Sequence, residues 1–187
     1  MCNAGYDRDL GAVVEALRAR GLWDDAVVVI TSDHGDMDGH HGLAFKGPAP
    51  YQMLQRVPLT IRVPPARGGR TGLRADDLVA NADIPATLLD YAGLPPPADG
   101  ISLRPVLEGR VEHHVRDEVV VRYPDPLMHT LRHGSWSYTR CADGRQWLFD
   151  LASDPDELHD RARDPAAAER VSALSARLDA WLARRRG

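Results

Sequence analysis

The stretch that decides the fold runs from Val27 to Arg62 and has the sequence VVVITSDHGDMDGHHGLAFKGPAPYQMLQRVPLTIR. It opens with an uninterrupted apolar run, Val27 to Ile30, and the polar residues Thr31 to Gly35 follow directly. This pattern predicts a buried parallel strand that carries polar side chains at its C-terminal edge. Because α/β sheets bind their ligands at that edge, we expect a functional site here.

Two of these polar residues have metal-binding chemistry. Asp33 offers a hard carboxylate oxygen and His34 an imidazole nitrogen, and Gly35 lets the backbone turn sharply beside them. The alternative is a simple strand-end turn in which the Asp33 side chain accepts a local hydrogen bond. The following residues, Asp36 to Pro50, contain three glycines and two prolines and show little periodicity, which predicts a functional loop.

The polar segment is similar to a pattern of the sulfatase family, which belongs to the alkaline-phosphatase-like superfamily. TSDHGDMDGHHGLAFKG resembles T-S-D-H-G-(D/E)-x-x-G-x-H-G-(L)-x-x-K-G, and RVPLTIRVP resembles the apolar strand that comes next in the family. Residue type and spacing agree at Asp33, His34, Gly35, Gly39, His41, Gly42, Lys46, Gly47, Arg56, Val57 and Pro58.

The resemblance implies roles for individual residues. Asp33 and His34 would bind a divalent metal, with calcium favoured and magnesium or manganese as alternatives. Lys46 would contact the sulfate, for which a flexible ammonium is a suitable point-charge partner, and His41 would line the catalytic site. His40 would face solvent, although a zinc cluster of His34, His40 and His41 is an alternative that the oxygen-rich surroundings disfavour.

The rest of the first half alternates helices and strands. Apolar residues at helical spacing predict a helix over Asp7 to Arg20, and a second apolar strand is expected over Val57 to Val63. Asp83 is expected to be the N-cap of a helix that ends at Gly93. Leu94 to Gly100, with three consecutive prolines, is expected to be a linker.

The second half has the spacing of an antiparallel sheet followed by a helix. Asp164 as N-cap and Pro165 at the first position predict the start of that helix, and Arg184 to Arg186 suit its C-terminal dipole. The stretches Gly100 to Gly109 and Phe149 to Leu158 also resemble sulfatase strings, so the resemblance covers essentially the whole chain. The expected strands are Glu118 to Tyr123, Met128 to His133, Trp136 to Cys141 and Trp147 to Asp150.

The expected fold class is therefore α/β. The resemblance implies the C-terminal part of a sulfatase fold: a partial α/β sheet, then a small antiparallel sheet with a C-terminal helix. We expect residues 1–100 to belong to the sulfatase core and residues 101–187 to form a small C-terminal subdomain.

Composition excludes several other classes. The 187 residues include 27 acidic and 23 basic side chains, so no basic footprint of a nucleic-acid-binding protein is present. No apolar run approaches membrane-spanning length, and no export signal is visible, which leaves the cytoplasm as the default location. Two cysteines, Cys2 and Cys141, do not form a disulfide framework and are expected to be unpaired thiols.

Features that the resemblance demands are missing from the sequence. Sulfatases use a formylglycine made from the Cys or Ser of a C/S-x-P-x-R motif, but Cys2 is followed by Asn-Ala-Gly, and Asp143 stands where the proline would follow Cys141. The paired N-terminal aspartates of the metal site and the upstream histidine are absent as well. We therefore expect a C-terminal fragment, inactive alone, whose nucleophile lies on a missing N-terminal part or a separate chain.

Two classes of function remain. The first is a metal-dependent hydrolase that acts on a sulfate-ester small molecule or glycan, with phosphonate or phosphodiester hydrolysis as an alternative within that class. The second is a pseudoenzyme that binds an anion or a partner without chemistry.

Overall fold

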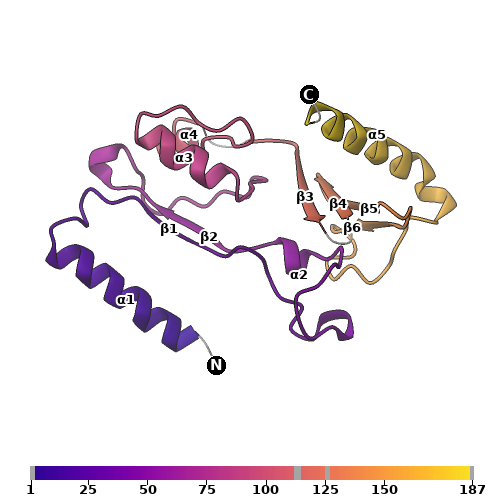
Figure 1. Cartoon of the computed structure of the whole chain (residues 1–187), viewed down its shortest axis with the longest axis horizontal. Helices are drawn as coiled ribbons and strands as arrows, with labels where there is room; N and C mark the ends of the chain where they lie inside the picture. The colour runs from indigo at the N-terminus through magenta and orange to yellow at the C-terminus, as the bar shows by residue number, and fades with distance from the viewer. Residues whose placement is uncertain (1–2, 112–114, 125–126, 186–187) are drawn as a thin grey trace. The chain divides into compact units, whose positions relative to one another are not determined.

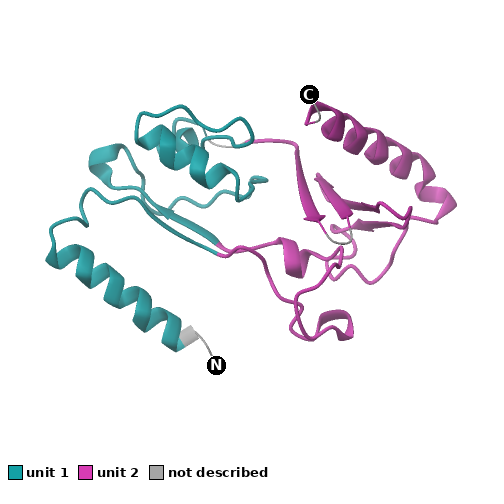
Figure 2. Ribbon diagram, viewed as in Figure 1, with its two compact units in different colours: residues 1–31, 59–114 teal, residues 32–58, 115–187 magenta. Residues whose placement is uncertain are grey.

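The computed structural model describes residues 3–111, 115–124 and 127–185. The chain divides into two compact units, the first formed by residues 1–31 and 59–114 and the second by residues 32–58 and 115–187 (Figure 2). The candidate site residues Asp33, His34, His41 and Lys46 all belong to the second unit. The expected domain division at residue 100 stays a prediction, because compactness alone does not define a domain of the family.

The first unit contains a helix and a pair of strands. Helix α1 spans Asn3–Ala19, which confirms the predicted helix and starts it earlier, and Gly21 then adopts a left-handed backbone (φ 66°). Strand β1 (Val28–Thr31) pairs with β2 (Leu59–Arg62), as Figure 1 shows.

The expectation that β1 is a buried parallel strand was wrong in both respects for the described residues. Its partner β2 runs antiparallel, with Val28 opposite Arg62, because the segment between the strands reverses the chain direction. In a two-stranded sheet each strand is an edge strand, so residues Val28 to Ile30 are half-buried and Thr31 is exposed.

Helix α3 (Asp83–Tyr91) confirms the predicted helix but corrects its cap. Ala82 occupies the N-cap position, and Asp83 is fully buried inside the first turn. Its carboxylate accepts hydrogen bonds from the backbone N–H groups of Ala80 (2.7 Å) and Ile101 (2.8 Å). Asp83 therefore connects the helix to two loops, which a capping rule based on local sequence does not foresee.

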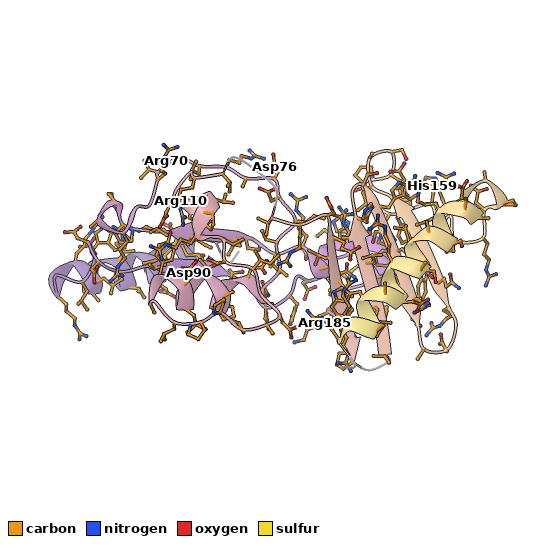
Figure 3. All side chains as sticks on the ribbon, turned by 90° about the horizontal axis from the view of Figure 1, so that it is seen from above. Arg70, Asp76, Asp90, Arg110, His159 and Arg185 are labelled. Carbon is orange, nitrogen blue, oxygen red and sulfur yellow. The ribbon has the colours of Figure 1, made fainter. Side chains whose placement is uncertain are left out.

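A cluster of charged side chains surrounds the short helix α4 (Arg104–Leu107). Arg104 donates to Asp90 (3.1 Å) and to Glu108 (2.6 Å), and Arg110 lies 2.7 Å from the second oxygen of Glu108. Figure 3 labels Asp90 and Arg110 in this unit. The cluster stabilises a segment for which the sequence predicted no helix. A 3-10 turn, η2 (Pro65–Arg67), follows β2.

The second unit contains a four-stranded antiparallel sheet in the order β3-β4-β5-β6 (Figure 1). All four predicted strands are confirmed to within one residue at each end. Their bounds are Glu118–Pro124, Leu127–His133, Trp136–Cys141 and Gln146–Asp150.

Helix α5 (Ala168–Arg184) covers one face of this sheet and confirms the predicted C-terminal helix. A 3-10 turn, η3 (Pro165–Ala167), precedes it, and the Asp164 carboxylate accepts a hydrogen bond from the N–H of Ala166 (2.9 Å). Asp164 therefore caps this turn, with Pro165 at its first position, whereas the N-cap of α5 itself is Ala167. Apolar side chains of α5 and the strands form the main core of the unit. Its largest members are Leu131, Tyr138, Leu148, Leu174 and Leu178.

The opposite face of the sheet carries the segment 32–58. The Gln55 side chain donates to the Thr130 hydroxyl (2.9 Å), and the ring of Tyr51 lies 6.0 Å from that of Phe149. Thr130 and Phe149 lie on the face away from the core, because the strand register places their neighbours on alternating sides. A single helical turn, α2 (Gln52–Gln55), lies at this contact and was not predicted.

Some terminal predictions fall outside the described residues, namely those on Cys2 and Arg186. Within the described part, Cys141 is a buried free thiol. Arg184 lies 3.3 Å from the Glu118 carboxylate, so this arginine of the terminal run contacts an acid as well as lying in the last helical turn. None of the helices in the described ranges is long and apolar enough to cross a membrane.

Candidate active site

The candidate site begins with a turn that positions Asp33 and His34. The Asp33 carboxylate accepts a hydrogen bond from the backbone N–H of His34 (2.9 Å), and the Ser32 hydroxyl donates to the His34 carbonyl (2.8 Å). The His34 N–H holds the pKa of the Asp33 carboxyl below its ordinary value, so Asp33 is ionised at neutral pH. A local hydrogen bond of the kind expected for a simple turn is therefore formed, and it leaves an exposed carboxylate beside the imidazole.

The imidazole of His34 is fixed by contacts at both ring nitrogens. Nδ1 lies 2.8 Å from the carbonyl oxygen of Gly35, and since a carbonyl only accepts, Nδ1 carries the proton. Nε2 then has a free lone pair, which accepts a hydrogen bond from the ammonium of Lys46 at 3.1 Å. The structure thus brings together three of the four predicted site residues: Asp33, His34 and Lys46.

The donor set of Asp33 and His34 fits part of a metal site. An imidazole whose Nδ1–H binds a backbone carbonyl is oriented to offer Nε2 as a ligand, and the Asp33 Oδ2 lies 3.5 Å from that atom. A hard cation needs six or more oxygen ligands. No group of three or more His, Cys, Asp or Glu side chains suited to a metal exists within the described ranges, so the zinc cluster of His34, His40 and His41 is not formed there.

His41 is held by an aromatic contact of its own. Its ring stacks on Tyr51 with centroids 3.7 Å apart and an interplanar angle of 7°. The His41 backbone has a left-handed conformation (φ 53°), which is unfavourable for a residue with a β-carbon and indicates that its surroundings fix it. His40, by contrast, is exposed, as predicted.

Gly35 is required by a close backbone approach. Its N–H donates to the carbonyl of Leu54 (2.9 Å), and a β-carbon at this position would lie 1.8 Å from the carbonyl oxygen of Met53. This contact packs the backbone at Gly35 directly against helix α2. Met37, in the loop that follows, is fully buried.

The comparisons with known proteins concern this same segment and the sheet beneath it. A family model described as "N-sulphoglucosamine sulphohydrolase, C-terminal" matches residues 39–184. The chain belongs to the sulfatase family. Choline-sulfatase of Rhizobium meliloti is 35% identical over 182 residues, which are 93% of this chain and 34% of the relative. Human arylsulfatase K is 34% identical, over 84% of this chain and 31% of the relative.

A solved structure agrees with this assignment. The phosphonate monoester hydrolase of Agrobacterium radiobacter superimposes with a TM-score of 0.86 at 31% identity, covering 97% of this chain and 40% of that one. This sulfatase-family chain spans about a third of the length of the curated relatives cited above. The shared fold confirms the α/β class expected from the sequence.

Two residues of this sulfatase-family segment were missed by sequence reasoning. Tyr51 holds the His41 ring, and its position directly after Pro50, the end of the predicted loop, gave only a weak signal. Glu157 lies in the Phe149 to Leu158 string, which was noted only for its resemblance to a sulfatase pattern and was given no role. It is 4% exposed, and its Oε2 accepts a hydrogen bond from the N–H of Gln52 (2.6 Å). No local pattern indicates that a glutamate in a turn is buried.

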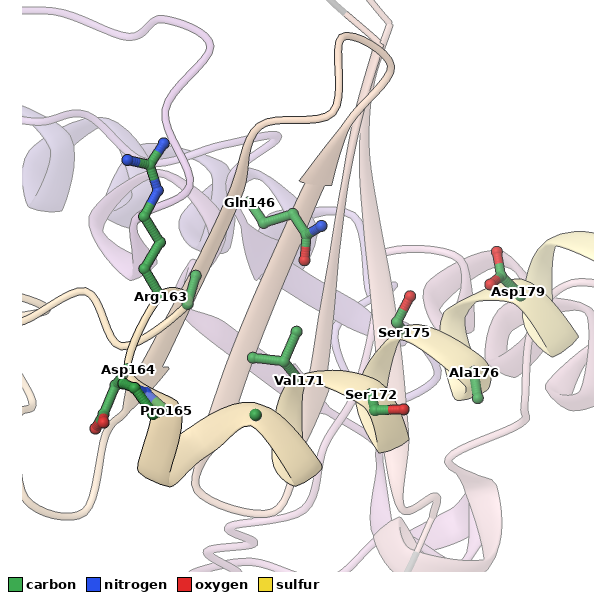
Figure 4. Close-up of a pocket in the computed structure, with 11 residues that line it drawn as sticks. Gln146, Arg163, Asp164, Pro165, Val171, Ser172, Ser175, Ala176 and Asp179 are labelled. Atoms are coloured by element: carbon green, nitrogen blue, oxygen red, sulfur yellow. The ribbon is translucent and has the colours of Figure 1, made fainter.

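A shallow groove of about 540 Å³ lies elsewhere in the second unit, along α5 (Figure 4). Gln146, Val171, Ser175 and Asp179 are among its lining residues. None of the predicted site residues lines it, and it faces the helix side of the sheet, so we do not assign it to the candidate active site.

Proposed function

We propose that this chain supplies part of the active site of a divalent-metal-dependent hydrolase of sulfuric esters. The observation that carries the proposal is the contact of the Lys46 ammonium with His34 Nε2 at 3.1 Å, beside the Asp33 carboxylate. A cation-binding pair and a positive point charge at one place are what a tetrahedral sulfuryl group requires. The family membership of the chain supports the same reaction class.

The residues have distinct roles in this proposal. The Asp33 carboxylate and His34 Nε2 would hold the cation, with calcium favoured and magnesium or manganese as alternatives; once bound, it would supply Lewis-acid polarisation and a template for the ester. The Gly35 carbonyl keeps the proton of His34 on Nδ1. Lys46 would neutralise charge that develops on the sulfuryl oxygens, and His41, whose ring stacks on Tyr51, would line the site.

The nucleophile lies outside these 187 residues in our proposal, so the chain alone is expected to be inactive. Burial raises the pKa of the Cys141 thiol, which makes this cysteine a poor nucleophile. Substrates in the proposed class are sulfate esters, of a small molecule or of a glycan. The curated relatives include a choline-sulfatase and arylsulfatase K, which fits that class.

Phosphonate monoester hydrolysis is a second candidate, favoured by the likeness to the Agrobacterium enzyme. The test is to complete the chain with the N-terminal part of a close relative that contains C/S-x-P-x-R, and to compare turnover of an aryl sulfate and an aryl phosphonate monoester. Faster turnover of the sulfate, lost in Asp33→Ala, supports the proposal. Preference for the phosphonate would favour the second candidate, and a folded, metal-loaded hybrid without either activity would favour a non-catalytic, anion-binding module.

A further inference from the structure

Glu157 connects two parts of the second unit that are far apart in the sequence. It follows strand β6 in the turn after Asp150, and its carboxylate accepts the N–H of Gln52 at 2.6 Å across 105 positions of the chain. Gln52 is the first residue of α2 and directly follows Tyr51, on which His41 stacks. The single hydrogen bond therefore lies one residue from the aromatic stack of the candidate site.

The surroundings of Glu157 show that its position is imposed by the fold. Its side chain is 4% exposed, and its backbone adopts the left-handed conformation (φ 57°) that residues with a β-carbon avoid. Asp154 fixes the turn, because its carboxylate accepts the backbone N–H groups of Leu158 (3.0 Å) and His159 (2.8 Å). A strained, buried acid that is fixed by its own turn is a common feature of functional sites.

A buried polar layer lies between this segment and the sheet. Gln55 donates to Thr130, whose hydroxyl lies 2.7 Å from that of Thr139 on the neighbouring strand. Within this layer, four buried side-chain atoms have no hydrogen-bond partner among the described residues: Glu157 Oε1, Gln55 Oε1, Ser137 Oγ and Arg132 Nη1. Ser137 lies opposite Arg132 in the β4–β5 register, so the layer is continuous with the sheet face that carries the segment.

We propose that Glu157 is a positioning residue of the candidate site, whose carboxyl group holds the start of α2 against the sheet and thereby fixes Tyr51 and the stacked ring of His41. It does not reach the reacting atoms and acts only through Gln52 and Tyr51. The proposal rests on the proposed function only in treating His41 as a site residue. The contacts themselves are independent of any reaction.

The positioning is expected to depend on pH. Burial raises the pKa of Glu157 from 4.5 to about 7, while the Gln52 N–H and Arg132 act in the opposite direction and Asp154 adds to the rise. Tyr51 is a further titratable group that interacts electrostatically with Glu157, and it also interacts with Asp160. Arg132 in turn interacts electrostatically with Arg56. Between pH 4.5 and about 7 the folded state keeps a proton on Glu157 that the unfolded state has lost. The contribution of Glu157 to the free energy of unfolding is therefore largest below pH 4.5, falls as the pH rises to about 7, and stays reduced above that pH.

The test uses the 187-residue chain and needs no turnover, so its failure is separate from a failure of the proposed function. Three variants are compared with the wild type: Glu157→Gln, which keeps an acceptor for Gln52 without charge; Glu157→Ala, which removes the acceptor; and Glu169→Gln, an exposed control on α5. The readouts are hydrogen exchange of the Gln52 amide, its ¹⁵N shift against pH, and the upfield ring-current shift of the His41 ring protons.

We expect a Gln52 titration step with a midpoint near pH 7 in the wild type and in Glu169→Gln, and no such step in Glu157→Gln. Glu157→Ala should lose the His41 ring-current shift and raise the exchange rate of the Gln52 amide at least tenfold, and Glu157→Gln should restore both. A Glu157→Ala chain that keeps both signals would overturn the proposal. If that variant does not fold, an unchanged Gln52 titration in Glu157→Gln would overturn it instead.

Discussion

Nε2 of His34 accepts a hydrogen bond from the ammonium of Lys46 at 3.1 Å. The nitrogen predicted to bind the metal is therefore occupied by the residue predicted to contact the sulfate. A cation that bound Nε2 would displace the lysine, which could then turn toward an anion. Metal binding would therefore be coupled to the placement of Lys46 in this chain.

The first prediction concerns metal binding by the chain alone. Asp33 and His34 provide only two ligands, so calcium should bind weakly, with a Kd on the order of 10⁻⁴ to 10⁻³ M. Lys46→Ala should tighten binding by roughly fivefold, because it removes a competing donor and a like charge. Isothermal titration calorimetry with calcium measures both. A stoichiometric submicromolar site in the wild type would contradict this prediction and would imply that Asp36 or Asp38 completes the ligand set.

Gly35 gives the second prediction. A β-carbon would lie 1.8 Å from the Met53 carbonyl oxygen, so Gly35→Ala must displace the turn or α2. We expect a loss of about 2 to 4 kcal/mol in the free energy of unfolding. Gly47→Ala, in the same loop with no atom within 4 Å of its β-carbon, is the matched control and should change stability by less than about 0.5 kcal/mol. Urea denaturation gives both values, and equal stability of the two variants would show that the contact can relax freely.

The sheet and terminal helix of the second unit could be predicted because their signals are local. Short alternating runs separated by turn residues identified the strands, and the Asp164-Pro165 cap with an apolar face identified α5. The helical turns α2 and α4 were missed, because four residues are too few to show a 3.6-residue period. The antiparallel pairing of β1 depends on how a long loop returns the chain, and no residue of the strand records that direction.

The candidate site, too, was predictable only in part. Asp33, His34 and Lys46 were found because their spacing resembles a family pattern, and the fold brings them together. Glu157 and Tyr51 were not found, because their importance arises from burial and from contacts across the chain. Glutamate side chains are usually exposed, so the burial of Glu157 could be recognised only in the structure.

The third prediction concerns acid stability of the first unit. A hydrogen bond from the Ser102 hydroxyl, and then the Arg104 guanidinium, lower the pKa of Asp90. A carboxyl with a lowered folded-state pKa stabilises the fold above its unfolded pKa of 3.8, and this contribution is lost as the pH falls below that value. Asp90→Asn should cost about 1 kcal/mol at pH 7 and little near pH 2, since the pair is partly exposed. Asp76→Asn, at a highly exposed acid, is the control and should show no such difference when thermal unfolding is followed against pH.

The last prediction separates the roles of Asp33 and Lys46 in a completed enzyme. In a hybrid with the N-terminal part of a close relative, Asp33→Ala should remove both bound metal and turnover, because no nearby group replaces a hard carboxylate ligand. Lys46→Ala should keep the metal and lower kcat/KM for an aryl sulfate by roughly 10²- to 10³-fold, the scale for one preorganised charge contact. Metal content by elemental analysis and steady-state kinetics distinguish the two variants. Lys46→Arg is the matched control: it keeps the charge, so it should recover part of the rate if charge is what matters, and full activity of Lys46→Ala would remove Lys46 from the site.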